Sequence, residues 1–147
     1  MILWSRADGR TGGRAVVRWS GRVPAGRVTD QTVITMDWTA TMLASGGVSG
    51  DPRYPLDGVD LLPLCQGQAV RFDRTLFWRT LKEEAVRAGA WKYLRTGKDE
   101  LLFDIPTDPG ERADLAAYQP NILARLRGQF REWNAQMLPR PDAPVSH

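Results

Sequence analysis

Four short β-strand candidates follow one another in residues 74–106, and their spacing constrains the fold more than any other feature. They begin roughly every 8 to 10 residues and are separated by turn signals such as Gly89 and TGKDE. Connections this short cannot hold crossover helices, so we expect the strands to pair antiparallel in one sheet. The four segments are RTLFWRT (74–80), EEAVRAG (83–89), AWKYLRTG (90–97) and ELLFDIP (100–106).

One face of this sheet is expected to be covered by a helix near the end of the chain. In the third strand candidate Trp91, Tyr93 and Arg95 share one face, as alternation requires. Pro120 then suits the first position of an amphipathic helix. Six large side chains follow at helical spacing, and their burial would contribute on the order of 10 kcal/mol of gross driving force. This apolar stripe comprises Ile122, Leu123, Leu126, Phe130, Trp133 and Met137.

The segment TDPGERADL (107–115) lies between the sheet and this helix and resembles a helix start. Thr107 is a candidate N-cap and Pro109 suits the first turn. The acidic residues of the segment would lie where a helix dipole favours negative charge. After residue 138, the tail LPRPDAPVSH has three prolines and no periodicity, so we expect residues 139–147 to be disordered.

The first half of the chain predicts a strand followed by a helix. AVVRW (15–19) is a β-branched run that ends in the turn-rich SGRVPAG. Apolar residues Ile34, Trp38, Met42 and Leu43 recur at helical spacing and predict a core-facing amphipathic helix. This helix would end at Gly46 and Gly47, with Thr35 or Asp30 as its N-cap.

A loop and a short helical segment complete the first half. Residues 48–60 are rich in glycine, proline and aspartate and predict a surface loop, and residues 59–67 predict one or two helical turns. The expected organisation is a remnant of an α/β core in residues 1–70, an antiparallel-sheet subdomain with its helix in residues 71–138, and the tail. The fold class is therefore α+β.

Cysteine and histidine usage excludes several chemistries. Cys65 is the only cysteine, which excludes an internal disulfide and a multi-cysteine zinc site. Cys65 follows an apolar run and is expected to be a buried, inert thiol. The only histidine is His147 at the terminus, where a general base or a catalytic triad is hard to position.

The charge pattern argues against nucleic acid and membrane partners. The net charge is +3 and the pI is near 9.4. However, the arginines are scattered among 17 acidic residues, without a basic block or a nucleic-acid-binding motif. No apolar run approaches the roughly 20 residues of a membrane span. Nothing in the sequence indicates a cellular compartment.

Six segments, taken in order, resemble the C-terminal portion of the arylsulfatase-type sulfatases of the alkaline-phosphatase-like superfamily. Each segment is weak by itself, but their order matches the family from about Ala15 to Met137. The resemblance implies that the first strand and helix are left over from a larger α/β domain. The segments are the strand, loop and helix of residues 16–47, YPLDGVDLLPL, RTLFWR, AVRAGAWKYLR, LLFDIPTDPGERADLA and the final amphipathic helix.

What the resemblance implies is sulfate-ester hydrolysis by a formylglycine residue assisted by calcium. No formylglycine motif and no paired aspartate ligands occur here, so we assign this chain no catalytic residue, metal ligand or cofactor. Cys65, in CQGQ, does not match a formylglycine precursor. The resemblance implies a sulfate-contacting lysine, whose place falls at Arg6 when counted from Gly12 and at Leu3 when aligned from Trp19. The candidate substrate contacts are Arg6 and Arg10.

These observations favour a C-terminal sulfatase fragment that is inactive by itself and pairs with the missing N-terminal half. An alternative is a free-standing interaction module that docks another protein chain through an exposed sheet edge. A third and weaker hypothesis is a hydrolase with a carboxylate site built from Asp57, Asp60 or Asp104.

Overall fold

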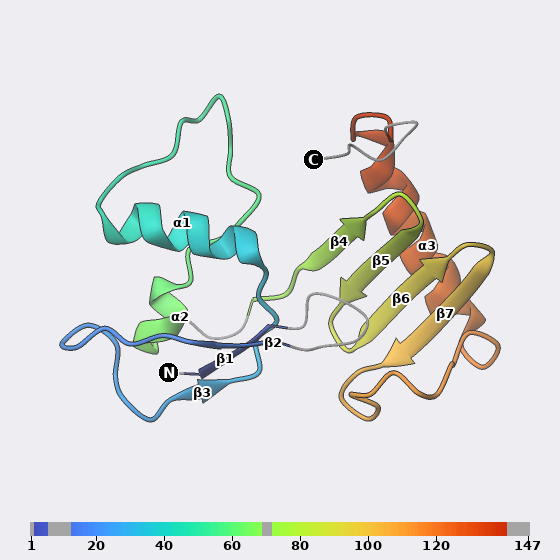
Figure 1. Cartoon of the computed structure of the whole chain (residues 1–147), viewed down its shortest axis with the longest axis horizontal. Helices are drawn as coiled ribbons and strands as arrows, with labels where there is room; N and C mark the ends of the chain where they lie inside the picture. Colours follow the sequence, from blue (N-terminus) through green and yellow to red (C-terminus); the bar gives the residue numbers. More distant parts are fainter. Residues whose placement is uncertain (1, 6–12, 69–71, 141–147) are drawn as a thin grey trace. The chain divides into compact units, whose positions relative to one another are not determined.

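The chain divides into two compact units, Met1–Phe72 and Asp73–His147. The computed structural model describes residues 2–5, 13–68 and 72–140, and Figure 1 shows the course of the chain. The architecture is mixed α+β, as the sequence predicts.

The second unit is built on a four-stranded antiparallel sheet, which confirms all four predicted strands. The strand order β4-β5-β6-β7 follows the sequence, so each strand pairs with the next through a short turn (Figure 1). Phe77, Val86, Tyr93 and Leu102 lie opposite one another in successive strands and form an apolar row across the sheet. The strands are β4 Thr75–Arg79, β5 Glu83–Ala88, β6 Trp91–Thr96 and β7 Asp99–Asp104.

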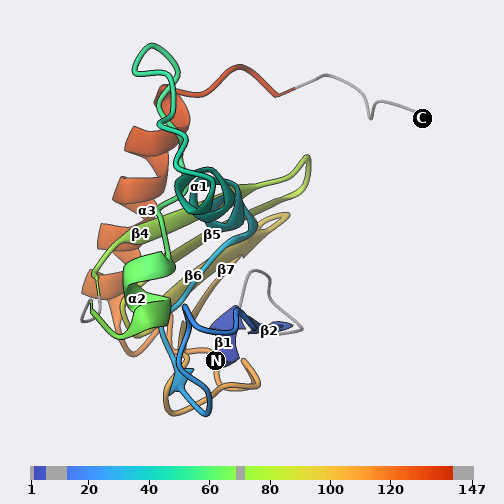
Figure 2. The ribbon, with the colours of Figure 1, turned by 90° about the vertical axis from the view of Figure 1, so that its left-hand side faces the viewer.

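Helix α3 (Pro120–Ala135) covers the face that carries this apolar row, as expected. Leu126 and Phe130 are buried against the row, and the Trp133 ring stacks on Phe77 with centroids 5.1 Å apart. Figure 2 shows the helix along one side of the sheet. The prediction was wrong for Met137, which lies beyond the end of the helix and is exposed.

The opposite face of the sheet is also largely buried, so the expectation of a single covered face was incomplete. Leu76, Lys92 and Phe103 project from that face, and all three are buried. A buried lysine requires a charged partner. Glu111 provides it, with both carboxylate oxygens accepting hydrogen bonds from Lys92 Nζ.

Residues 105–119 form turns, so the predicted helix start at Thr107 and Pro109 was wrong. The Asp108 carboxylate accepts hydrogen bonds from the backbone N–H groups of Arg112 and Ala113. Asp114 likewise accepts from the N–H groups of Leu102 and Ala116, which attaches the turns to β7. The carboxylates of these two residues therefore accept hydrogen bonds from backbone N–H groups of turns and strand, and not from a helix N-terminus.

The first unit contains a small mixed sheet in the order β2-β1-β3. Strand β1 (Ile2–Ser5) pairs antiparallel with β2 (Gly13–Val16) and parallel with β3 (Val28–Thr29). The predicted strand at residues 15–19 ends earlier, at Val16. Val16 lies opposite Ile2, where its partner strand β1 begins, and a turn follows in which the Trp19 carbonyl accepts hydrogen bonds from the N–H groups of Arg22 and Val23.

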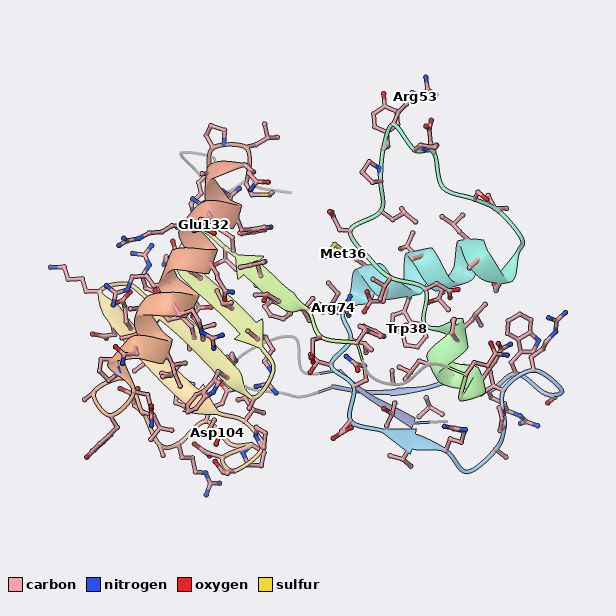
Figure 3. All side chains as sticks on the ribbon, turned by 180° about the vertical axis from the view of Figure 1, so that it is seen from behind. Met36, Trp38, Arg53, Arg74, Asp104 and Glu132 are labelled. Carbon is pink, nitrogen blue, oxygen red and sulfur yellow. The ribbon has the colours of Figure 1, made fainter. Side chains whose placement is uncertain are left out.

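Helix α1 (Thr35–Ser45) is present as predicted, but the face that it buries is different. Its buried residues are Asp37, Ala40 and Thr41, whereas Met42 is 67% exposed. Trp38 does pack on a core of Val33, Leu61, Leu64 and Cys65 (Figure 3). The short helix α2 (Leu62–Gln66) supplies two of these core residues.

The N-cap of α1 also differs from both predicted residues, Thr35 and Asp30. Ile34 occupies the N-cap position, and its side chain has no group that could accept a hydrogen bond. Instead, Asp37 Oδ2 reaches back 2.8 Å to the Ile34 N–H. Half of a capping box thus forms without a polar N-cap residue.

Candidate functional site

Of the residues singled out in the sequence, three carboxylates lie in the described part of the chain, namely Asp57, Asp60 and Asp104. Arg6 and Arg10 lie outside the described residues. Asp60 Oδ1 accepts a hydrogen bond from the Leu62 N–H at 2.8 Å, which stabilises the start of α2. Asp57 belongs to the exposed loop of the first unit, whereas Asp104 ends β7 of the second (Figure 3).

The contacts of Asp104 are made by its backbone rather than by its carboxylate. The Asp104 backbone carbonyl accepts hydrogen bonds from the Thr107 hydroxyl and the Asp108 N–H. Asp104 Oδ1 is buried without a hydrogen-bond partner in the described part of the chain. Across residues 2–5, 13–68 and 72–140, no three or more Asp, Glu, His or Cys side chains are grouped so that they could hold a metal ion.

Cys65 has the character of a core residue. Its side chain is fully buried beside Val33 and Leu61. Burial raises the pKa of the Cys65 thiol because the thiolate is poorly solvated in the core. A thiol in this setting is a poor nucleophile at neutral pH.

Asp37 is the polar residue that organises the first unit, and the sequence analysis missed it. Its Oδ1 accepts a hydrogen bond from the Val59 N–H at 3.0 Å, while Oδ2 accepts from Ile34. One turn later, the Thr41 hydroxyl accepts from the Leu61 N–H at 2.9 Å and donates to the Asp37 carbonyl. A single acidic residue inside an otherwise uncharged helix was the signal in the sequence for this role.

Gly58 permits this attachment of the loop to α1. A Cβ atom at Gly58 would lie 2.1 Å from the Met36 carbonyl oxygen, closer than any real Cβ contact. Only glycine therefore allows the LDG segment to approach the first turn of the helix. The contacts of Asp37 and Gly58 hold the backbone of the loop against α1 and do not position a reacting group.

An open cavity of about 750 Å³ lies along residues 16–26 of the first unit. The Arg22 guanidinium sits 5.6 Å from the centre of the Trp19 ring, in cation–π geometry. Arg18, Trp19 and Arg22 are exposed, and no acidic residue occurs in this segment. Cationic and aromatic groups without a base or a nucleophile suit binding of an anionic or sugar-like group rather than catalysis.

Within the described ranges, none of the helices combines the length and the apolar character needed to span a membrane.

Several sulfatases are among the known proteins to which this chain is similar. No protein-family model matches it. N-acetylgalactosamine-6-sulfatase of Canis lupus familiaris is 28% identical over 145 residues, covering 77% of this chain and 28% of that protein. Arylsulfatase A of Bos taurus is 31% identical over 120 residues, covering 76% of this chain and 23% of the relative.

The fold agrees with this similarity. The crystal structure of Ps i-CgsB in complex with k-i-k-neocarrahexaose matches 78% of this chain and 27% of its own, with a TM-score of 0.69 and 24% identity. The chain thus spans less than a third of the length of the proteins it matches. It is a homologue of sulfatases, as the resemblance of its ordered motifs to that family predicts.

Proposed function

We propose that this chain serves as the C-terminal segment of a sulfuric ester hydrolase, where it completes the fold and forms part of the wall of the substrate cleft. The proposal rests on how much of this chain, and how much of each related sulfatase, the sequence similarity covers. Sulfatases match about three quarters of the chain, yet the chain spans under a third of their length. The reacting groups would then come from another stretch of polypeptide.

Residues 16–26 are the segment proposed to contact substrate. Their exposed Arg18 and Arg22 would attract a sulfate ester, and Trp19 offers an apolar ring for a sugar or aryl group. Asp37 and Gly58 would not contact substrate; they would hold helix α1 and its loop together in the same unit. Formylglycine and calcium supply the nucleophile and the electrophilic assistance in the proposed complete enzyme.

The proposal is tested by complementation. The purified chain is assayed on an aryl sulfate with calcium, by itself and after co-expression with the N-terminal segment of a related sulfatase. We expect the chain to match the buffer blank and the co-expressed pair to hydrolyse the ester. Turnover by the chain itself, or a pair no more active than the N-terminal segment, would contradict the proposal.

A second candidate function is an interaction module that docks another protein chain, and the outer strands of the first sheet favour it. Strands β2 and β3 are the two edges of that sheet, and Val16 and Val28 are 73% and 65% exposed. Open edges of this kind accept an added strand. A Val28→Lys variant that loses a partner but leaves complementation intact would favour this second function.

A further inference from the structure

The α3-facing side of the second sheet carries a row of alternating charges at one end. Arg79, Glu84, Arg95 and Glu100 lie opposite one another in successive strands. Glu84 accepts hydrogen bonds from Arg95 Nε and from Arg140 Nη2, each at 2.6 Å. The two carboxylates of this charged row are thus already engaged, because Glu100 accepts the Tyr93 hydroxyl at 2.7 Å.

A cavity of about 400 Å³ lies over the charged row. Four cationic side chains and two carboxylates line it, which leaves an excess of two positive charges. The cations are Arg95 from β6, Lys98 from the β6–β7 turn, and Arg127 and Arg131 from α3. The Arg127 and Arg131 positions are four residues apart, so they share one side of the helix.

Three of these cations retain donors that no neighbour uses. In the part of the chain that the structure describes, Lys98 and Arg131 are exposed and form neither an ion pair nor a hydrogen bond. Arg127 Nε lies 3.2 Å from Glu100 Oε1, but it is buried and its N–H makes no aligned hydrogen bond. These donors are available to form charge-assisted hydrogen bonds to an anion in the cavity.

We propose that this cavity binds a tetrahedral oxyanion, either a free ion or a sulfate or phosphate group carried on a sugar. Arg127 and Arg131 would offer planar guanidinium forks to two of its oxygens, and Lys98 would add a point charge from the β6–β7 turn. Arg95 and Arg140 hold Glu84, and Glu100 accepts the Tyr93 hydroxyl and offsets part of the Arg127 charge, so the excess of two positive charges remains for the ligand. The inference does not depend on the proposed function, because all of these residues lie in the second unit.

Calorimetric titration of the full chain tests this site. The probes are N-acetylglucosamine 6-sulfate, N-acetylglucosamine 6-phosphate, inorganic sulfate and unsubstituted N-acetylglucosamine. We expect the oxyanions to bind, more weakly at higher salt, and the neutral sugar not to bind. If inorganic sulfate binds as tightly as the sugar sulfate, the site recognises the ion itself. If the sugar sulfate binds more tightly, the site recognises the sulfate ester.

Matched variants locate the binding. Lys98→Gln and Arg131→Gln should each raise Kd about tenfold, as the loss of one charge-assisted hydrogen bond implies. Both residues are exposed, so the melting temperature should not change. Lys82→Gln and Arg125→Gln, exposed cations outside the cavity, should leave Kd within twofold. Absence of oxyanion binding to the unmodified chain, or equal losses in the control variants, would overturn the proposal.

Discussion

Lys92 Nζ lies 2.9 Å from Glu111 Oε1 and 2.8 Å from Glu111 Oε2. Their side chains are only 7% and 11% exposed, so water screens neither charge well. Glu111 also has a φ of 55°, a left-handed backbone conformation that non-glycine residues seldom adopt. The ion pair therefore holds a strained turn against the sheet.

Removal of one partner of this pair should be costly. Lys92→Met leaves the Glu111 carboxylate buried and unpaired, and we expect it to lower the free energy of unfolding by about 3–5 kcal/mol. The double variant Lys92→Met/Glu111→Leu should recover most of that loss, because it leaves no buried charge. Urea unfolding followed by tryptophan fluorescence measures both, with Lys82→Met as the exposed control. A Lys92→Met variant as stable as that control would refute the role of the pair.

Glu84 should make stability depend on pH in the acid range. Burial disfavours its charged form, but the hydrogen bonds and charges of Arg95 and Arg140 together outweigh burial and lower the Glu84 pKa below the ordinary value of 4.5. A lowered folded-state pKa contributes stability that is present above the unfolded pKa, and that is lost as pH falls through the folded pKa. We expect Glu84→Gln to cost about 1–3 kcal/mol at pH 7. The cost should shrink below about pH 4, and a cost that is constant with pH would contradict this assignment.

Gly58 should tolerate no side chain. Gly58→Ala places a Cβ against the Met36 carbonyl and should either displace the loop from Asp37 or destabilise the unit by about 1–3 kcal/mol or more. Gly50→Ala is the matched control in the same loop, since its Cβ would meet only the Leu56 side chain, at 3.7 Å. Thermal unfolding of the two variants should differ clearly.

Cys65 should react slowly with thiol reagents while the chain is folded. Burial raises the pKa of its thiol and blocks access, so little thiolate forms near pH 8. Iodoacetamide labelling followed by mass spectrometry should accelerate sharply in denaturing urea. Labelling at the same rate in native buffer would show that the core around α2 is open.

The elements that the sequence predicted well are those with strong local patterns. The four strands of the second unit and α3 followed from alternation and from helical spacing, and both patterns match the faces that are buried. In α1 the same reasoning favoured Met42, yet the buried face carries Asp37 and Thr41. Their burial depends on backbone N–H donors some 20 residues away, which periodicity cannot reveal.

The charged cavity was equally hidden. Lys98 and Arg131 lie 33 positions apart in the sequence, and each alone resembles a solvated surface cation. Only the hairpin turn and the direction of α3 bring them to one cavity. The pairing of Lys92 was hidden as well, because its acceptor, Glu111, comes from a turn that the sequence wrongly predicted as a helix start.

The attachment of loop 48–58 to α1 has a consequence for variation among related chains. The Val48 N–H donates to the Leu43 carbonyl at the helix C-terminus, and the Val59 N–H donates to Asp37 near its N-terminus. Residues 48–57, between these two points, are all exposed. Doubling the length of such a closed excursion costs only about 0.6 kcal/mol. Because both ends of the loop are fixed to helix α1, residues 48–57 can change in length and sequence without disturbing the core of the first unit.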